Sequence, residues 1–247
     1  LKDRYEKDKS NCHLILAAKT RKGVGDLNYA LSEANITGYY YRPRVDLELL
    51  MALDPKDVFV TTACVGGIWK YGAEEAERLV ALLNDHFRGS FMLEVQAHNV
   101  EKQKDVNRLV LDLYRKYNIP LIAATDSHFI YPEDSKLRDQ LLESHHLKYE
   151  DEEGWDMDYP SEKHLLDRIK AQGMLSVAQI NEAMENTNVF LDFEDVVFDK
   201  RRKLPPAYPD MTQEERNQKY LDLVHEAWNQ YKAEVPQEHW PEYEEAM

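Results

Sequence analysis

The stretch FMLEVQAHNVEKQKDVNRLVLDLYRKYNIPLIAATDSH, residues 91–128, decides the fold class of this chain. It begins with a short apolar run at 91–95 that predicts a buried strand, and it continues with a helical pattern at 101–117. A second apolar run follows at 120–125. A strand, a helix and another strand in this order are typical of a parallel sheet covered by helices. The sequence therefore predicts an α/β fold.

The same alternation of strands and helices extends toward the start of the chain. The further predicted elements are strands at 13–18 and 58–62 and helices at 25–34, 45–53 and 73–87. Four strands within about 130 residues are too few for an eight-stranded barrel. Two alternatives remain, which are a small open sheet and a barrel whose first strands lie upstream of Leu1.

The second half of the chain shows helical patterns without strands. They lie at 137–142, 179–186 and 212–232, a further helix opens at 161–164, and an acidic loop spans 149–159. Prolines and basic residues between 199 and 210 are typical of a linker. We therefore expect three segments: 1–160 with the sheet, 161–203 as a helical extension and linker, and 204–247 as the helical start of a further region.

Composition and charge exclude several classes of protein. The chain has 247 residues, of which 43% are hydrophobic and 31% charged, and this excludes collagen, a coiled-coil rod and bulk disorder. No apolar run reaches the roughly 18–20 residues that a membrane helix needs. The net charge of −15 makes the chain a poor candidate for holding DNA phosphates over its whole surface. The two cysteines, Cys12 and Cys64, suit a reducing cytoplasm.

One basic run stands out against this acidic background. It consists of Lys200, Arg201, Arg202 and Lys203. Two interpretations remain open, which are a solvated linker and a local contact with nucleic acid.

Four side chains with metal-binding chemistry stand at the ends of predicted strands. His13 opens the first strand, Cys64 follows the second, and Asp126 and His128 follow the last. Residues two apart in an extended segment point the same way, so Asp126 and His128 can face one point. Sites in parallel α/β folds lie beyond the carboxyl ends of the strands. Two imidazoles, a thiolate and a carboxylate suit zinc, manganese or iron rather than calcium.

Each of these residues also has a purely structural interpretation. A single Asp-x-His at a strand end is common, His13 could cap its strand, and Cys64 could be a small buried hydrophobic residue. His145 and His146 lie in a polar, acidic stretch and are interpreted as solvated surface.

The order of these motifs resembles the alpha subunits of bacterial DNA polymerase III, in their polymerase-and-histidinol-phosphatase (PHP) domain and the segment that follows it. The matching elements are CHLILAAK (12–19), GYYYRPRVD (38–46), TACVGG (62–67), FMLEVQ (91–96) with Gln103 and Asn107, and AATDSH (123–128). DQLL (139–142) and residues 159–166 resemble the elements that follow this domain, and ENT (185–187) resembles a turn of the family. LPP (204–206), the helical pattern at 212–231 and residues 242–243 resemble the approach to the palm. The resemblance covers almost the whole chain.

The resemblance implies a PHP-type distorted (β/α)7 barrel, incomplete at its N-terminus in this chain, followed by a mostly helical segment. It implies a cluster of up to three metals, with ligands at His13, Cys64, Asp126 and His128. The implied cofactors are zinc, manganese or iron in the complete PHP site and magnesium for the parent polymerase. The other PHP ligands would lie upstream of Leu1 and the palm carboxylates beyond Met247. We therefore expect a slice of a longer protein that is inactive alone.

The resemblance also implies a function for the parent protein. That function is DNA-directed DNA synthesis in replication, in the cytoplasm, by a nucleotidyltransferase whose PHP domain has metal-dependent phosphoesterase or 3′–5′ exonuclease potential. The alternative is a non-catalytic scaffold that docks a proofreading exonuclease subunit, and a stand-alone metal phosphoesterase is favoured less. The implied partners are DNA through the full-length protein, the proofreading subunit and other replisome proteins, but no membrane.

Overall fold

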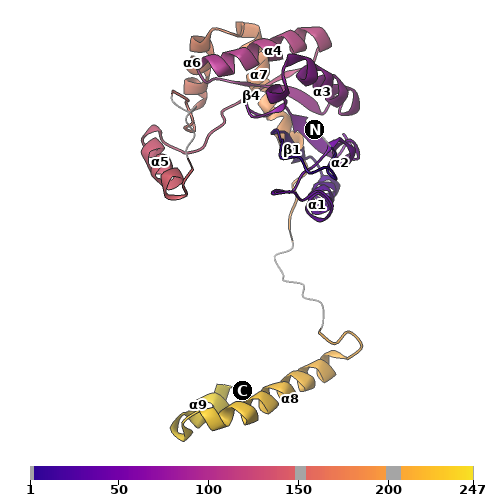
Figure 1. Ribbon diagram of the computed structural model, residues 1–247, viewed down its shortest axis with the longest axis vertical. Coiled ribbons are helices and arrows are strands. Elements are labelled where there is room, and N and C mark those ends of the chain that lie inside the picture. Colours follow the sequence, from indigo (N-terminus) through magenta and orange to yellow (C-terminus); the bar gives the residue numbers. More distant parts are fainter. Residues whose placement is uncertain (1–2, 148–153, 199–206, 247) are drawn as a thin grey trace. The chain divides into compact units, whose positions relative to one another are not determined.

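The computed structural model describes residues 3–147, 154–198 and 207–246. They fall into two compact units, Leu1–Val196 and Val197–Met247 (Figure 1). The strands are β1 (Ile15–Ala18), β2 (Val58–Thr61), β3 (Phe91–Gln96) and β4 (Leu121–Ala124). The helices of the first unit are α1 (Arg21–Ile36), α2 (Leu47–Met51), α3 (Ala73–His86), α4 (Glu101–Tyr117), α5 (Ser135–Ser144), α6 (Glu162–Gln172) and α7 (Val177–Glu185). Its 3-10 turns are Ile68–Tyr71, Pro132–Asp134 and Asn186–Asp192.

The four strands form one sheet in the order β1-β2-β3-β4. β2 and β3 are parallel, as are β3 and β4, in which Gln96 pairs with Ala124. β1 runs antiparallel to β2, with Ile15 opposite Thr61. The predicted α/β class is confirmed, and the predicted parallel sheet is confirmed for β2–β4 but wrong for β1. The barrel form of the fold stays a prediction.

The connections between the strands explain the direction of β1. One α-helix, α3, leads from β2 to β3, and one, α4, leads from β3 to β4, so each returns the chain to the same end of the sheet. Two α-helices, α1 and α2, lie between β1 and β2, and β2 begins at the end of the sheet where β1 ends, since Ala18 pairs with Val58. The start of β1 therefore lies at the same edge of the sheet as the carboxyl ends of β2, β3 and β4.

Helix α1 begins earlier than its apolar pattern predicts. The side chain of Thr20 accepts a hydrogen bond from the backbone N–H of Gly23, which caps the helix at Arg21 rather than at residue 25. Gly23 lies where α1 crosses the end of the sheet. A Cβ atom there would come within 2.1 Å of the carbonyl oxygen of Asp57, so only glycine permits this approach.

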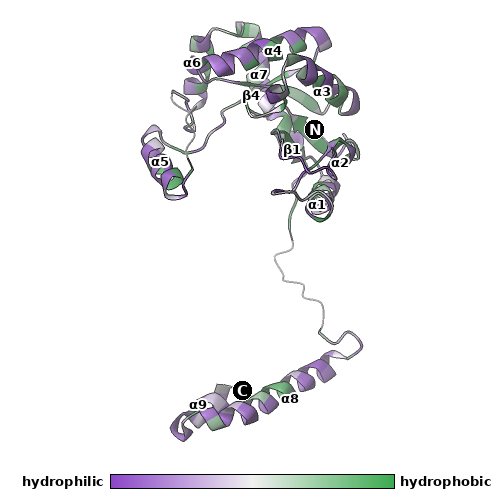
Figure 2. Cartoon of the chain, in the orientation of Figure 1, coloured by the Kyte–Doolittle hydropathy of each residue, from purple (hydrophilic) through white to green (hydrophobic). Residues whose placement is uncertain are grey.

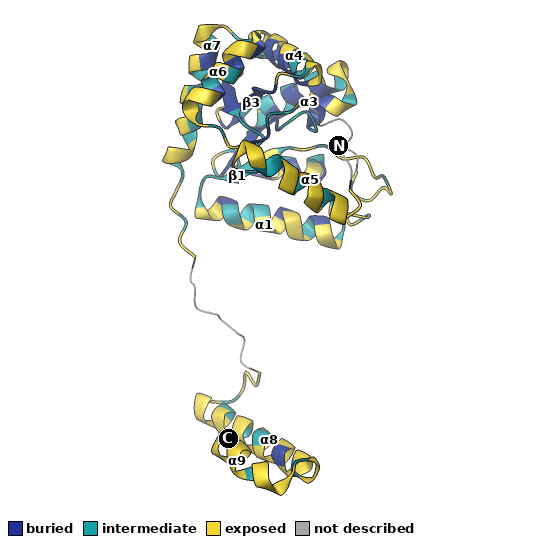
Figure 3. Cartoon of the chain, turned by 90° about the vertical axis from the view of Figure 1, so that its left-hand side faces the viewer, coloured by how far each residue is buried: buried dark blue, intermediate teal, exposed yellow. Residues whose placement is uncertain are grey.

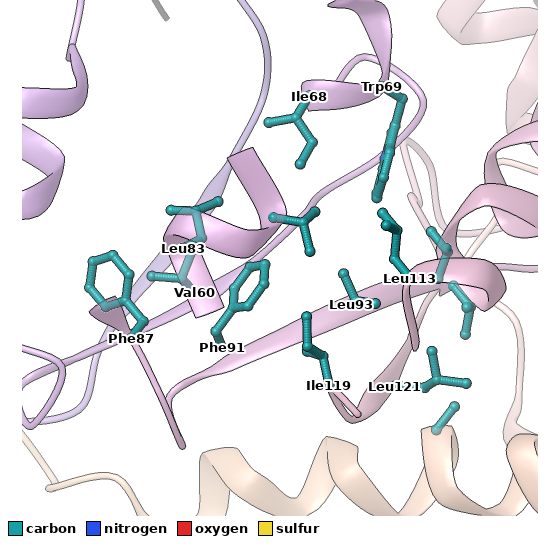
Figure 4. Close-up of a cluster of buried hydrophobic side chains, with 14 of the residues drawn as sticks. Val60, Ile68, Trp69, Leu83, Phe87, Phe91, Leu93, Leu113, Ile119 and Leu121 are labelled. Carbon is teal, nitrogen blue, oxygen red and sulfur yellow. The ribbon is translucent and has the colours of Figure 1, made fainter. Parts of the chain in front are cut away.

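The hydrophobic core lies between the sheet and the helices that cover it. Figure 4 shows the labelled side chains of β2, β3, α3 and α4 gathered in one cluster. Phe91, Leu93 and Leu83 are almost completely buried within it. Burial of a large apolar side chain stabilises a fold by about 1.5–3 kcal/mol, so this cluster holds the sheet and the helices together. Figure 2 shows that α4 keeps much hydrophilic surface on its outer side.

Helices α6 and α7 belong to the same unit as the sheet. Ile169 of α6 and Ile180 of α7 are buried in the common core. The side chain of Asn186 donates a hydrogen bond of 2.7 Å to the carbonyl oxygen of Leu121 in β4. In contrast, no side chain of α5 is buried, and Figure 3 shows this helix largely exposed. The predicted boundaries at 160 and 203 stay predictions.

The second unit contains α8 (Gln213–Tyr231) and α9 (Trp240–Ala246), with 3-10 turns at Lys232–Glu234 and Gln237–His239. Thr212 and Glu215 form a capping box at the start of α8. The rings of Trp228 and Tyr243 stack with centroids 5.2 Å apart, and Lys232 pairs with Glu244 at 2.7 Å. These contacts hold α9 against α8.

None of the helices in the described ranges combines the length and the apolar character that crossing a membrane requires. The basic run Lys200, Arg201, Arg202 and Lys203 lies outside the described residues.

Candidate metal site at the sheet edge

The predicted ligands come from the segments at one edge of the sheet. His13 precedes β1 by two residues, and Cys64 follows β2. Asp126 and His128 follow β4. Because β1 runs opposite to its neighbours, its start reaches the edge where the other strands end. The structure thus places the four residues along the same edge, which for His13 depends on the reversed direction of β1.

His13 and Cys64 are in direct contact. The Nδ1 atom of His13 lies 3.5 Å from the Sγ atom of Cys64. The loop that follows β2 fixes both, since the backbone N–H of His13 donates to the carbonyl of Gly66 at 2.9 Å and the N–H of Gly66 points at Sγ at 3.4 Å. A Cβ atom on Gly66 would lie 3.2 Å from Nδ1 and 3.5 Å from Sγ. The glycine therefore leaves room beside both donor atoms.

The distance between these donor atoms fits a shared metal ion. Zinc binds imidazole nitrogen at about 2.1 Å and thiolate sulfur at about 2.3 Å, and tetrahedral coordination then separates nitrogen and sulfur by about 3.6 Å. The observed separation of Nδ1 and Sγ is 3.5 Å. His13 and Cys64 can therefore occupy adjacent ligand positions of one ion.

The segment after β4 presents His128 in one tautomer. Its Nδ1 atom lies 2.8 Å from the carbonyl oxygen of Asp126. Because a carbonyl oxygen only accepts, Nδ1 carries the proton, and Nε2 of the neutral ring keeps a lone pair for a metal. Asp126 itself has a left-handed backbone with φ of 50°. Such a conformation is uncommon for a residue other than glycine and indicates a position held by its surroundings.

A segment from the acidic loop holds this part of the edge in place. The backbone N–H of His128 donates to the carbonyl of Met157 at 2.8 Å, and the hydroxyl of Ser127 donates to the carbonyl of Asp158 at 2.9 Å. The carboxylate of Asp158 pairs with Arg168 of α6 at 2.8 Å. The backbone of the Asp126–His128 segment is therefore tied to α6.

The charges at the edge act on one another. Burial raises the pKa of the Cys64 thiol, the N–H of Gly66 lowers it, and the negative charges of Asp126 and Glu94 raise it further. Burial also raises the pKa of Glu94, and Asp126 adds to this rise. A bound cation reverses these effects, because it stabilises the thiolate and the carboxylates. Without a cation these groups therefore favour their neutral forms, and a bound cation would favour the thiolate and the carboxylates.

The structure adds two residues that the sequence analysis does not single out. Glu94 of β3 is buried and accepts hydrogen bonds from Thr61 at 2.7 Å and Gln96 at 2.8 Å. His98 follows β3 and has an exposed fraction of 1%. The signal was available, because His98 stands as far beyond its strand as Asp126 stands beyond β4. An imidazole just past an apolar strand follows the same rule as the four predicted residues.

The edge residues do not yet converge on one point. Within the described ranges, no three His, Cys, Asp or Glu side chains come together closely enough to hold a metal ion. The metal-ligand role of His13, Cys64, Asp126 and His128 therefore stays a prediction. His145 and His146 are exposed, which agrees with their interpretation as solvated surface.

Comparisons with known proteins show which families this chain is similar to. Residues 3–98 match the family model of the PHP domain. The chain is 39% identical to DNA polymerase III subunit alpha of Aquifex aeolicus over 132 residues, which are 51% of this chain and 11% of that protein. It is 33% identical to the subunit of Borreliella burgdorferi over 147 residues (58% and 13%) and 34% identical to that of Treponema pallidum over 139 residues (53% and 12%).

These matches span between 11% and 13% of the length of the three relatives. Residues 3–98 are therefore similar to PHP domains, and about half of the chain is similar to a part of the alpha subunits of DNA polymerase III.

Proposed function

We propose that this chain is the PHP-containing part of a replicative DNA polymerase III alpha subunit, and that its sheet edge binds a divalent transition metal. The similarity to alpha subunits from three bacteria supports the first part. The contact between His13 and Cys64 carries the second, because their donor atoms lie 3.5 Å apart, as adjacent ligands of one ion do.

Each predicted ligand has a separate role in this proposal. His13 and Cys64 bind side by side from neighbouring strands, while His128 offers Nε2 and Asp126 a carboxylate from the end of β4. This mixture of nitrogen, sulfur and oxygen donors suits zinc, manganese or iron. Such an ion, when bound, generates hydroxide near neutral pH and stabilises a leaving oxygen, which is the chemistry of phosphodiester hydrolysis. The whole protein would then combine DNA synthesis, which uses magnesium, with 3′–5′ exonuclease activity.

The proposal also limits how this chain meets DNA. Its net charge of −15 repels the phosphate backbone, so DNA must be held locally or by other parts of the polymerase. The basic run from Lys200 to Lys203 is the proposed local contact. We expect this chain alone to bind duplex DNA weakly in a fluorescence anisotropy titration. Sub-micromolar affinity that falls with added salt would contradict this expectation.

Cobalt binding tests the metal proposal directly. Co²⁺ bound to a thiolate gives an intense near-ultraviolet charge-transfer band, which reports sulfur ligation without any measurement of activity. We expect the chain to show this band when titrated with Co²⁺ and the Cys64→Ser variant to lack it. Cys12→Ser is the matched control, because Cys12 is also a half-buried free cysteine but precedes His13 rather than facing it.

The outcomes separate the metal proposal from a structural role of Cys64. Loss of the band in Cys64→Ser and its retention in Cys12→Ser would support a metal centre at the edge. Absence of the band in the unchanged chain, together with no zinc, manganese or iron by elemental analysis, would refute it.

A non-catalytic scaffold that docks a proofreading exonuclease is the second candidate function. One observation favours it, namely that the described side chains contain no ready-made group of three metal ligands. The chain stripped of metal by a chelator would then bind the exonuclease as tightly as the untreated chain, measured by calorimetry. Nuclease activity of the full-length polymerase that is lost in Asp126→Asn would instead favour the metal-dependent enzyme.

A further inference from the structure

His98 lies level with Asp126 at the carboxyl edge of the sheet. In the parallel pairing of β3 with β4, Gln96 stands opposite Ala124, and these are the last residues of their strands. His98 and Asp126 each follow two residues later. The register of the sheet thus brings this imidazole beside the segment that carries Asp126 and His128.

The backbone of His98 is firmly fixed. Its carbonyl oxygen accepts a hydrogen bond of 2.8 Å from the side chain of Gln172 in α6. The same side chain donates to the carbonyl of Gln96 at 3.0 Å, and Asn107 of α4 donates to that carbonyl at 2.9 Å. The ring of Trp155 lies against the imidazole, with centroids 4.8 Å apart. The imidazole is therefore held in a defined position from two sides.

The ring nitrogens of His98 contrast with this well-bonded backbone. The side chain is buried, yet neither Nδ1 nor Nε2 has a hydrogen-bond partner among the described residues. A buried polar atom without a partner is costly, because it has lost its hydrogen bonds to water and gained none in return. A group such as a water molecule or a metal ion at the ring would supply the missing partner. The edge of the sheet is where that group would lie.

The surroundings of His98 favour a cation over an anion. The charges that act on the ring come from Asp126 and Asp156, and from Arg168 and His128 on the positive side. Arg168 is already paired with Asp158 at 2.8 Å. Burial lowers the pKa of His98, so the ring stays neutral and keeps a lone pair near neutral pH. Asp156 also lies 4.0 Å from Arg168, so Asp126 is the carboxylate that would repel an anion here and attract a metal ion.

We propose that His98 is a further metal ligand of the sheet edge, joining Asp126 and His128 on one divalent transition-metal ion. This inference rests on the proposed function, which places the metal at the same edge. Asp126 is half-buried and His128 exposed, whereas His98 is buried and Gln172 fixes its backbone. His98 thereby supplies the buried part of the ligand set, and the β4 segment supplies the more exposed part.

Replacement of His98 by phenylalanine separates ligation from packing. Phenylalanine keeps an aromatic ring against Trp155 but has no nitrogen. Because the nitrogens of His98 make no hydrogen bonds in the described structure, His98→Phe should leave the melting temperature of the metal-free chain unchanged or raise it. Its affinity for Mn²⁺ or Zn²⁺, measured by competition with a chelator, should fall at least about 10-fold.

His86→Phe is the matched control for this variant. The Nε2 atom of His86 lies 2.9 Å from the carbonyl oxygen of Leu53, and its ring packs on Phe87 away from the edge residues. This variant should lose stability and keep its metal affinity. The opposite behaviour of the two histidines would exclude a general effect of replacing histidine by phenylalanine.

The possible results distinguish this inference from the proposed function. Unchanged metal affinity in His98→Phe, alongside a clear loss in Asp126→Asn, would refute the role of His98 and leave the metal site standing. No metal binding by the unchanged chain would refute both. If His98→Phe fails to fold, nitrogen NMR of the imidazole in the unchanged chain decides. A large Zn²⁺-dependent shift of one ring nitrogen of His98 supports ligation, and unchanged resonances overturn it.

Discussion

Two neighbouring glycines after β2 should respond very differently to the same substitution. A Cβ atom on Gly67 would lie 2.5 Å from the carbonyl oxygen of Thr62 and 2.9 Å from that of Cys64. Both obstacles are backbone atoms, and the N–H of Gly67 bonds to the carbonyl of Cys64 at 2.8 Å, so neither can move cheaply. On Gly66 the nearest atom would be Nδ1 of His13 at 3.2 Å, which belongs to a side chain that can turn.

The size of the effect follows from these distances. A carbon and an oxygen atom normally approach to about 3.2 Å, so alanine at position 67 overlaps a backbone oxygen by roughly 0.7 Å. Overpacking of this kind costs about 1–3 kcal/mol, and the rigid backbone puts Gly67→Ala at the upper end. That corresponds to a fall in melting temperature of about 4–12 °C for a unit of this size. Gly66→Ala should change stability by less than about 1 kcal/mol, because the restricted unfolded chain offsets the mild crowding.

Urea unfolding followed by tryptophan fluorescence measures both variants, and a Co²⁺ titration of each then tests the site. Gly67→Ala should unfold at a clearly lower urea concentration than the unchanged chain. Gly66→Ala should unfold at nearly the same urea concentration as the unchanged chain but bind Co²⁺ about 10-fold less tightly, since the methyl group displaces the His13 ring. Equal stability of the two variants, or full cobalt affinity in Gly66→Ala, would show that the loop does not hold His13 and Cys64 as described.

Three further predictions concern stability. Asp46→Ala removes one of the two carboxylates that pair with Arg4, at 2.9 Å, and leaves Glu48 at 2.8 Å; it should cost about 1–3 kcal/mol in urea unfolding. Burial opposes ionisation of Asp46, but hydrogen bonds from Arg4 and from the Leu49 N–H lower its pKa overall. The stabilisation by ionised Asp46 is therefore complete above its unfolded pKa of 3.8 and is lost as the pH falls through its lower pKa in the folded state. Stability of the Asp46→Ala variant should therefore depend less on pH in acid unfolding. Leu93→Ala, at a fully buried position of β3, should cost about 2–5 kcal/mol by the same urea assay. Thr212→Ala removes the capping box of α8 and should lower helicity and cost about 1 kcal/mol, measured by circular dichroism during thermal unfolding.

Much of the fold follows from hydrophobic periodicity alone. The four strands and the helices between them lie where apolar runs and 3–4-residue spacings predict them. The direction of β1 does not follow, because an apolar run does not show which way its strand runs relative to its neighbours. Only the pairing of Ile15 with Thr61 shows that β1 is antiparallel to β2. The start of α1 is also hidden, since Arg21 and Lys22 add no apolar periodicity and the cap depends on one side-chain hydrogen bond of Thr20.

The candidate site also contains residues that the sequence predicts and residues that only the structure shows. Strand ends predict His13, Cys64, Asp126 and His128, and the contact of His13 with Cys64 emerges in three dimensions. Glu94 is hidden within an apolar strand, where a single carboxylate resembles a solvent-facing residue. His98 becomes informative only when its surroundings are known, because its unpartnered nitrogens are a property of the packing and not of the sequence.

The hydrogen bond from His128 to Met157 and the ion pair of Asp158 with Arg168 connect helix α6 to the edge of the sheet. A shift of this helix would pull the end of β4 through two short links, and Gln172 on the same helix would carry His98 with it. Loss of Arg168 would therefore disturb the position of the proposed ligands from a residue that is not itself among them.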